Sequence, residues 1–151
     1  EQDLIMSCTG FDGSMGIGAE DATVTSFASY TNVPNARDIN VTINSDKSEV
    51  SDRTSAFKNY VAGGLDCEIT TTLTYDSNDT TQSTIRTACI GRTRLVVGVF
   101  DGSLAASAEG IAFDAYVFSN DIAQPLADGQ TYSVTFAPAS EGSVPAWSTL
   151  V

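Results

Sequence analysis

The chain has 151 residues and a formal net charge of −12, from 19 acidic and 7 basic residues. This length fits a single domain, residues 1–151, that buries its core without disulfides or a metal ion. The negative charge argues against nucleic-acid binding, which needs clustered positive charge to displace counterions from phosphates. The sequence has no histidine, so a Ser-His-Asp triad and histidine metal sites are excluded. No carboxylate pair is spaced for acid–base catalysis, and we expect no enzyme, no cofactor and no metal site.

The charges are distributed unevenly along the chain. All basic residues lie between Arg37 and Arg94, whereas residues 1–36 and 95–151 carry only acidic charges. Acidity in a domain usually serves solubility alone. A basic middle between acidic ends also permits complementary contacts between copies of the same chain.

The cysteines favour a reducing compartment, and the apolar runs argue against a membrane-spanning segment. Cys8, Cys67 and Cys89 are odd in number and lack CxxC spacing, which favours free thiols over a disulfide framework. We expect Cys67 and Cys89 to be small buried side chains. No apolar run is long enough to span a bilayer. The opening EQDLIMSC lacks the basic start and apolar core of a signal peptide.

Loops and strands alternate in the first half of the chain. Residues 7–22 are rich in Gly, Ser and Asp, which predicts a loop or mobile arm. Residues 23–30 predict a strand and residues 32–35, with their proline, a turn. Alternation of apolar and polar residues over 38–44 and again over 65–75 predicts two strands, each with one polar face. Between them, residues 46–63 predict a long polar loop, and such loops in compact domains are usually functional.

One helix is predicted, over residues 79–90. Asp79 can accept hydrogen bonds from the free amides of the first turn, and its spacing to Gln82 resembles a capping box. Ile85 and Ala88, with Cys89, share one helix face. Gly91 predicts the end of the helix.

The remaining elements complete a mainly β fold. The apolar run 95–100 predicts a strand buried on both faces, and residues 111–118 and 131–137 predict two more. The segment 139–151 is rich in Pro, Ser and Gly and predicts an irregular arm that carries an exposed Trp147. We expect a β-sandwich or β-barrel of about six to eight antiparallel strands with one flanking α-helix and a long inter-strand loop. Residues 1–22 and 139–151 would be terminal arms around a β core over 23–138.

The order of these elements, with the residues that they carry, resembles the phage tail tube (major tail) protein family. The matching segments cover roughly residues 23–140 and read VPNARDINVTI, KSEVSDRTSAFKNYVAGG, LDCEITTTLTYDSNDTTQSTIRTACIGRTRLVVGVFD and AFDAYVFSNDIAQPLADGQTYSVTFAPAS. The loop in the second segment departs from the family pattern, because Ser51-Asp52-Arg53-Thr54-Ser55 stands in place of a Thr-x-Arg.

The resemblance implies a structural protein of a virion or gene transfer particle. Subunits of this family form hexameric rings that stack into a hollow tube, and DNA passes through the lumen without specific binding. The implied partners are further copies of the chain, with tail terminator, tape-measure and baseplate proteins at the tube ends, and no membrane. The implied location is the virion tail, assembled in the cytoplasm of a bacterial host.

Two groups of residues are candidates for this role. The polar residues of the two alternating strands are predicted to face the lumen: Asp38, Asn40, Thr42, Asp66, Glu68, Thr70 and Thr72. Charged residues of the loop, with the tryptophan near the end, are predicted to form the contact between rings: Lys47, Glu49, Asp52, Arg53, Lys58 and Trp147.

Two other functions remain open at this stage. One is the inner tube of a contractile injection system, which shares the tail tube fold. The other is a secreted adhesive or carbohydrate-binding β-sandwich, favoured by strands rich in Thr, Ser, Asn and Asp. The odd cysteine count and the missing signal peptide argue against this second alternative.

Overall fold

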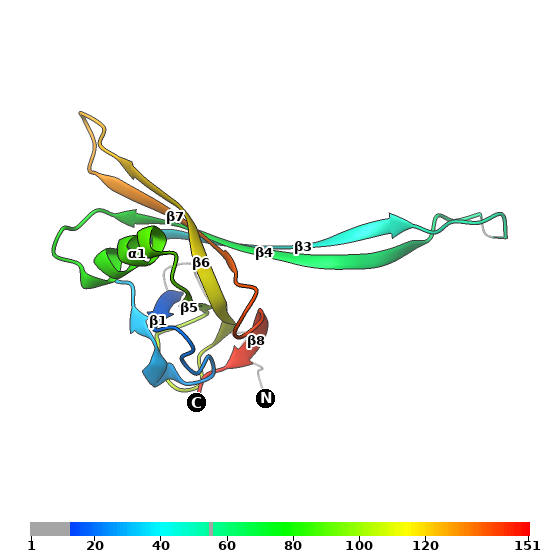
Figure 1. Ribbon diagram of the computed structural model, residues 1–151, viewed down its shortest axis with the longest axis horizontal. Coiled ribbons are helices and arrows are strands. Elements are labelled where there is room, and N and C mark those ends of the chain that lie inside the picture. Colours follow the sequence, from blue (N-terminus) through cyan, green and yellow to red (C-terminus); the bar gives the residue numbers. More distant parts are fainter. Residues whose placement is uncertain (1–12, 55) are drawn as a thin grey trace, which may run out of the picture.

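In the described part of the chain, eight strands form one antiparallel sheet, and a single α-helix covers part of one face (Figure 1). The structure is a computed structural model that describes residues 13–54 and 56–151. In chain order the elements are β1 (Ser14–Gly18), a 3-10 turn η1 (Phe27–Ser29), β2 (Thr31–Asn32), β3 (Ala36–Glu49), β4 (Tyr60–Thr74), α1 (Thr80–Gly91), β5 (Leu95–Phe100), β6 (Glu109–Ala123), β7 (Thr131–Pro138) and β8 (Ala146–Thr149). The predicted mainly β fold with one helix is confirmed.

The sheet is curled but not closed. Its strand order is β2-β1-β5-β6-β7-β4-β3, and β8 pairs with the first part of β6. Strand β6 joins two parts of the sheet, because residues 110–115 pair with β5 and residues 115–123 pair with β7. The two ends of the sheet, β2 and β3, are not hydrogen-bonded to each other. The fold is therefore a curled, sandwich-like sheet with open edges.

The core lies between α1 and the apolar face of the sheet. Ile69 and Leu73 of β4 and Phe136 of β7 are fully buried there, together with Ile85 of the helix. Helical spacing places Ile85 and Ala88 on the buried side of α1, as predicted. A second, smaller cluster lies on the other side of β5 and contains Tyr30, Val96, Phe100, Ala108, Ala112 and Leu150.

The predicted loop over 46–63 is strand at both of its ends. The β3–β4 ladder continues to the pair Glu49–Tyr60, and only residues 50–59 form the connection. Gly63 falls within the predicted loop, but it belongs to β4 and lies at a register shift where the two strands approach closely. A Cβ at Gly63 would come 3.0 Å from the Cβ of Asp46. Figure 1 shows the result, a long hairpin that projects from the body; residues 43–66 are called the β3–β4 extension below.

Three further predictions about the ends of the chain were wrong in part. Residues 23–30 form turns and η1 instead of a strand, because successive amides bond three residues back, as in Ser26 N to Thr23 O at 3.2 Å. The predicted N-terminal loop contains β1, which buries Met15 and Ile17, and the predicted C-terminal arm contains β8 and the buried Leu150. Residues 7–12 of the predicted N-terminal arm lie outside the described residues.

Helix α1 starts as predicted, but the side chain of Gln82 makes other hydrogen bonds than those of the predicted capping box. Oδ1 of Asp79 accepts hydrogen bonds from the amide and hydroxyl of Thr81, at 2.9 and 2.6 Å. The predicted capping box is wrong, since the side chain of Gln82 bonds the backbone of Asp76 and Thr74 and so ties the helix to β4. Gly91 belongs to the helix, and the left-handed residue that ends it is Arg92, with φ 54°.

Removing the helix cap should destabilise the fold in a pH-dependent way. Burial by itself would raise the pKa of Asp79, but hydrogen bonds from Thr81 and Asn35 outweigh it and hold the pKa below its usual value. A lowered folded-state pKa adds stability above the unfolded pKa, and that stability is lost as pH falls through the folded pKa. Asp79→Ala should lower the free energy of unfolding by about 1–2 kcal/mol at neutral pH.

Urea denaturation followed by circular dichroism would measure this loss. The difference between the wild type and Asp79→Ala should shrink as the pH falls below the folded pKa. Asp128→Ala, at an exposed position before β7, is the control and should change little. A loss that stays the same in acid would show that Asp79 acts through packing and not as an ionised cap.

Candidate assembly interface

One face of β3 and β4 is polar from Asp38 to Asn44 and along the residues of β4 opposite them. Directly opposed pairs on this face are Asp38–Thr72, Asn40–Thr70 and Thr42–Glu68, with Asp66 opposite Asn44. Opposed residues in an antiparallel pair lie on the same side of the sheet. The structure therefore brings all the residues predicted to face the lumen onto one surface: Asp38, Asn40, Thr42, Asp66, Glu68, Thr70 and Thr72.

The polar surface continues across two more strands. Thr70 of β4 is opposite Thr135 of β7, and Thr135 is opposite Ser119 of β6. In the next row, Thr72 of β4 is opposite Ser133 of β7, and Ser133 is opposite Asp121 of β6. We call this surface, over β3, β4, β7 and residues 116–123 of β6, the polar face. The sequence analysis missed the contributions of β7 and β6. The signal was present, because the apolar residues of 131–137 alternate with serine and threonine.

The four strands of the polar face end in two free edges. In the described part of the chain, β3 pairs only with β4, and residues 116–123 of β6 pair only with β7. Three successive antiparallel pairings make β3 and β6 run in opposite directions. Free edges present unpaired backbone donors and acceptors, which favour pairing with another chain.

The opposite face of the β3–β4 extension is apolar and uncovered. Near the body this face belongs to the core, where Ile69 and Cys67 are buried. Further out, Ile43 is 56% exposed and Leu65 is 77% exposed, although they continue the same face. The tip adds more exposed apolar side chains: Val50, Phe57, Tyr60 and Val61. Lys47 and Glu49 lie between these side chains, opposite Ala62 and Tyr60, so exposed apolar and charged groups are close together on the β3–β4 extension. Several exposed apolar side chains close together on a protein surface often mark an interaction site.

The residues predicted to contact the next ring lie in two places, with the charged residues in one and Trp147 in the other. The β3–β4 extension carries five of them: Lys47, Glu49, Asp52, Arg53 and Lys58. Nζ of Lys47 lies 4.6 Å from the centre of the Tyr60 ring, and the amide of Val50 donates to the carbonyl of Asn59 to close the tip. Trp147 is not on the extension. It belongs to β8, which lies in the body (Figure 1), and it is opposite Ile111 and exposed.

Arg94 is used inside the subunit. Its side chain is 9% exposed, and its guanidinium lies 2.7 Å from Glu20 and 3.2 Å from Asp21. The hydrogen bond to Glu20 raises the pKa of Arg94. The neighbouring Asp114 is buried and accepts from the amide of Ser143 at 2.6 Å. These contacts fasten the segments before β2 and before β8 to the sheet.

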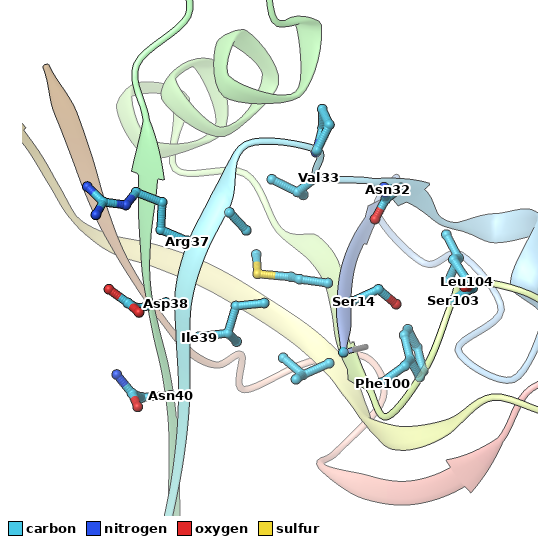
Figure 2. A pocket seen from close by; sticks show the side chains of 15 residues that line it. Ser14, Asn32, Val33, Arg37, Asp38, Ile39, Asn40, Phe100, Ser103 and Leu104 are labelled. Atoms are coloured by element: carbon cyan, nitrogen blue, oxygen red, sulfur yellow. The ribbon is translucent and has the colours of Figure 1, made fainter. Parts of the chain in front are cut away.

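A groove separates the two ends of the curled sheet. It has a volume of about 1050 Å³ and lies between β1 and the first residues of β3, with the loop after β5 on its third side (Figure 2). Met15, Val33 and Phe100 form its buried floor. Among the described residues, no helix is both long and apolar enough to cross a membrane.

Comparison with known proteins finds similarity in structure alone. No protein family matches the sequence, and no curated protein is similar to it. A chain of the SPP1 tail tube is 12% identical with a TM-score of 0.76, over 96% of this chain and 81% of that chain. A chain from the tail of the empty gene transfer agent particle, which has C6 symmetry, is 15% identical with a TM-score of 0.70, over 93% of this chain and 100% of that chain.

A third similar structure comes from a contractile system. A chain of the sheath–tube complex of the PVC extracellular contractile injection system, in its extended state, is 11% identical with a TM-score of 0.65. The match covers 97% of this chain and 95% of that chain. The protein therefore has the fold of the tail tube proteins of phages, gene transfer agents and contractile injection systems.

Proposed function

We propose that the chain is a structural, non-enzymatic subunit of a phage-type tail tube, in which hexameric rings stack into a conduit for genome delivery. The observation that carries the proposal is the polar face, a four-stranded surface with one free edge at β3 and another at β6. An isolated subunit gains nothing from two long unpaired edges, which are an aggregation hazard. A closed ring of copies removes both.

Ring closure follows from the strand directions. Because β3 and β6 run in opposite directions, a rotation about an axis roughly parallel to the strands brings β3 of one copy against β6 of the next as an antiparallel pair. Repetition of this contact gives a closed cyclic barrel. The C6 symmetry of the gene transfer agent tail, whose chain shares this fold, supports six copies in the ring.

The polar face is the side that fits a lumen. The opposite face of the same strands is covered by α1 and the core near the body, so it is not available to line a channel. Asp38, Asp66, Glu68 and Asp121 give the polar face negative charge, and their neighbours are mainly hydroxyl and amide side chains, with Arg37 beside Asp38. Acidic walls repel phosphates, so DNA would slide through without specific binding.

Stacking of rings is assigned to the β3–β4 extension. It projects beyond the body of the subunit (Figure 1) and carries an exposed apolar face together with the charged residues predicted to lie between rings. Contact with the next ring would bury Ile43 and Leu65 and pair charges around them. Head-to-tail contacts of this kind repeat without limit, as a tube requires.

The wider setting follows from the same role. The tube would lie in a virion tail assembled in the cytoplasm of a bacterial host, with tail terminator, tape-measure and baseplate proteins at its ends. The second candidate function is the inner tube of a contractile injection system, and the similarity to a chain of the PVC sheath–tube complex favours it. The adhesive β-sandwich gains no support from the fold comparison.

Covalent crosslinking tests the ring contact. We expect the pair Asn40→Cys and Asp121→Cys, on the two free edges, to give a ladder of linked oligomers with a short bismaleimide. The background would be Cys8→Ser, Cys67→Ala and Cys89→Ser. Within one copy the two edges are separated by two strands, about 14 Å along the sheet. The ladder should end at the hexamer.

Each single-cysteine variant is the control for this experiment and should give dimers at most. Gel electrophoresis reads the ladder, and negative-stain microscopy of the unlinked protein should show rings or tubes. Monomers in both measurements, at concentrations where the chain is folded, would contradict the ring proposal.

A charge on the apolar face of the β3–β4 extension should stop stacking but leave rings intact. Burying a leucine side chain contributes about 1.5–3 kcal/mol, and the ring repeats each contact. Leu65→Asp should therefore abolish long tubes in negative-stain images while rings persist. Ile90→Asp, at an equally exposed position on α1, is the matched control and should form tubes normally. Tubes of normal length from Leu65→Asp would show that another surface stacks the rings.

Reversing two charges on the same extension should have a weaker effect. Partly exposed ion pairs contribute only about 0.2–1 kcal/mol each, and salt screens them. Arg53→Glu with Lys58→Glu should shorten tubes at low salt, and high salt should reduce the difference from the wild type. Sedimentation across a salt series measures this. Loss of tubes greater than for Leu65→Asp would mean that charge dominates the stacking.

A further inference from the structure

The groove beside β3 opens along an unpaired strand edge. Figure 2 shows Ile39 pointing into the groove, whereas Arg37, Asp38 and Asn40 point to the other side of the strand. The floor is apolar and buried, and the wall made by β3 keeps its outer backbone groups free in the described chain. A site with an apolar floor and a free strand edge is suited to another strand, whose backbone pairs while its side chains fill the pocket.

The outer part of β6 has the matching pattern. Asp121 is opposite Ser133 and belongs to the polar face, whereas Ile122 is opposite Tyr132, which is a core residue. Ile122 therefore lies on the apolar side of the sheet, yet it extends beyond the core and is 48% exposed. It has the size and chemistry to fill an apolar groove.

Strand geometry places this side chain over the groove of a neighbouring copy. If β6 of one copy pairs with β3 of the next and the polar faces are continuous, the apolar side of β6 must fall on the same side as Ile39. The charges agree, since Arg37 lies at the exposed start of β3 and Asp121 on the approaching edge. Asp38 lies beside Arg37 on the same edge, so Arg37 is the group on β3 that could pair with Asp121. The two edges thus offer charged and polar groups on one side of the sheet and apolar groups on the other.

We propose that in the assembled ring Ile122 of one copy inserts into the groove of the next copy, beside Ile39 and above Met15. This inference rests on the proposed ring. It assigns the groove to a second copy of the chain, and it makes Ile122 one of the residues that select β6 as the strand that pairs with β3.

The first test combines a groove variant with the edge crosslinks. Ile122→Asp in the Asn40→Cys, Asp121→Cys background should raise the protein concentration needed for the crosslinked ladder about tenfold or more, because an apolar burial of this size is lost. Ile90→Asp in the same background is the matched control and should leave the ladder unchanged. Circular dichroism would confirm that each variant is folded.

A second measurement follows the groove itself under conditions in which rings still form. Ser103→Cys, at the exposed groove wall, would carry a solvatochromic dye in the cysteine-free background, without the crosslinking pair. Ring formation should shift the dye emission to the blue, and Ile122→Ala should reduce that shift at equal ring content.

The outcomes separate this inference from the proposed function. No ladder in the parent crosslinking protein would overturn the ring, and the groove assignment with it. A normal ladder in Ile122→Asp, or an undiminished dye shift in Ile122→Ala rings, would overturn the groove assignment alone.

Discussion

The antiparallel register between β3 and β4 is the constraint on which the other surfaces depend. Side chains alternate along a strand, so the pair Val41–Ile69 assigns one face to the core and the pair Asn40–Thr70 assigns the other to solvent. A slip of one residue would exchange the two faces along the whole hairpin. Because β7 and β6 continue the same alternation, four strands share one mainly polar surface, with a register shift at Phe118 of β6.

Strands β3 and β4 are longer than the core that they help to form. They contain 14 and 15 residues, but only the first residues of β3 and the last residues of β4 contribute to the apolar cluster of the core. The excess length carries an apolar face into solvent and leaves a long edge unpaired. Both features are unfavourable in an isolated subunit. In the proposed tube the same features become the contacts within and between rings, so the surfaces that make the free subunit prone to self-association also specify the assembly.

Charge is arranged differently in each region of the subunit. The polar face combines carboxylates with hydroxyl groups, whereas Arg94 is enclosed by Glu20 and Asp21 within the body. The basic middle of the sequence therefore does not form one basic surface. In the proposed tube, its part in contacts between copies would fall to the β3–β4 extension, with Lys47, Arg53 and Lys58, and to Arg37 at the edge of β3. Exposed charges at these places would orient the contacts, while apolar burial would supply more of the free energy.

Local patterns in the sequence predicted the polar face of β3 and β4 and the start of α1 at Asp79. Both depend on residues within a few positions of one another, through strand alternation and helix capping. The length of the β3–β4 extension was not predicted, because Gly63 and its neighbour suggested a loop and only pairing with β3 makes them strand. Strands β1 and β8 were missed because they are short and are held by partners far along the chain. The sequence by itself thus determined which side chains share a face, and the tertiary structure alone decided which faces are covered, where strands end and which edges stay free, since those depend on contacts between distant segments.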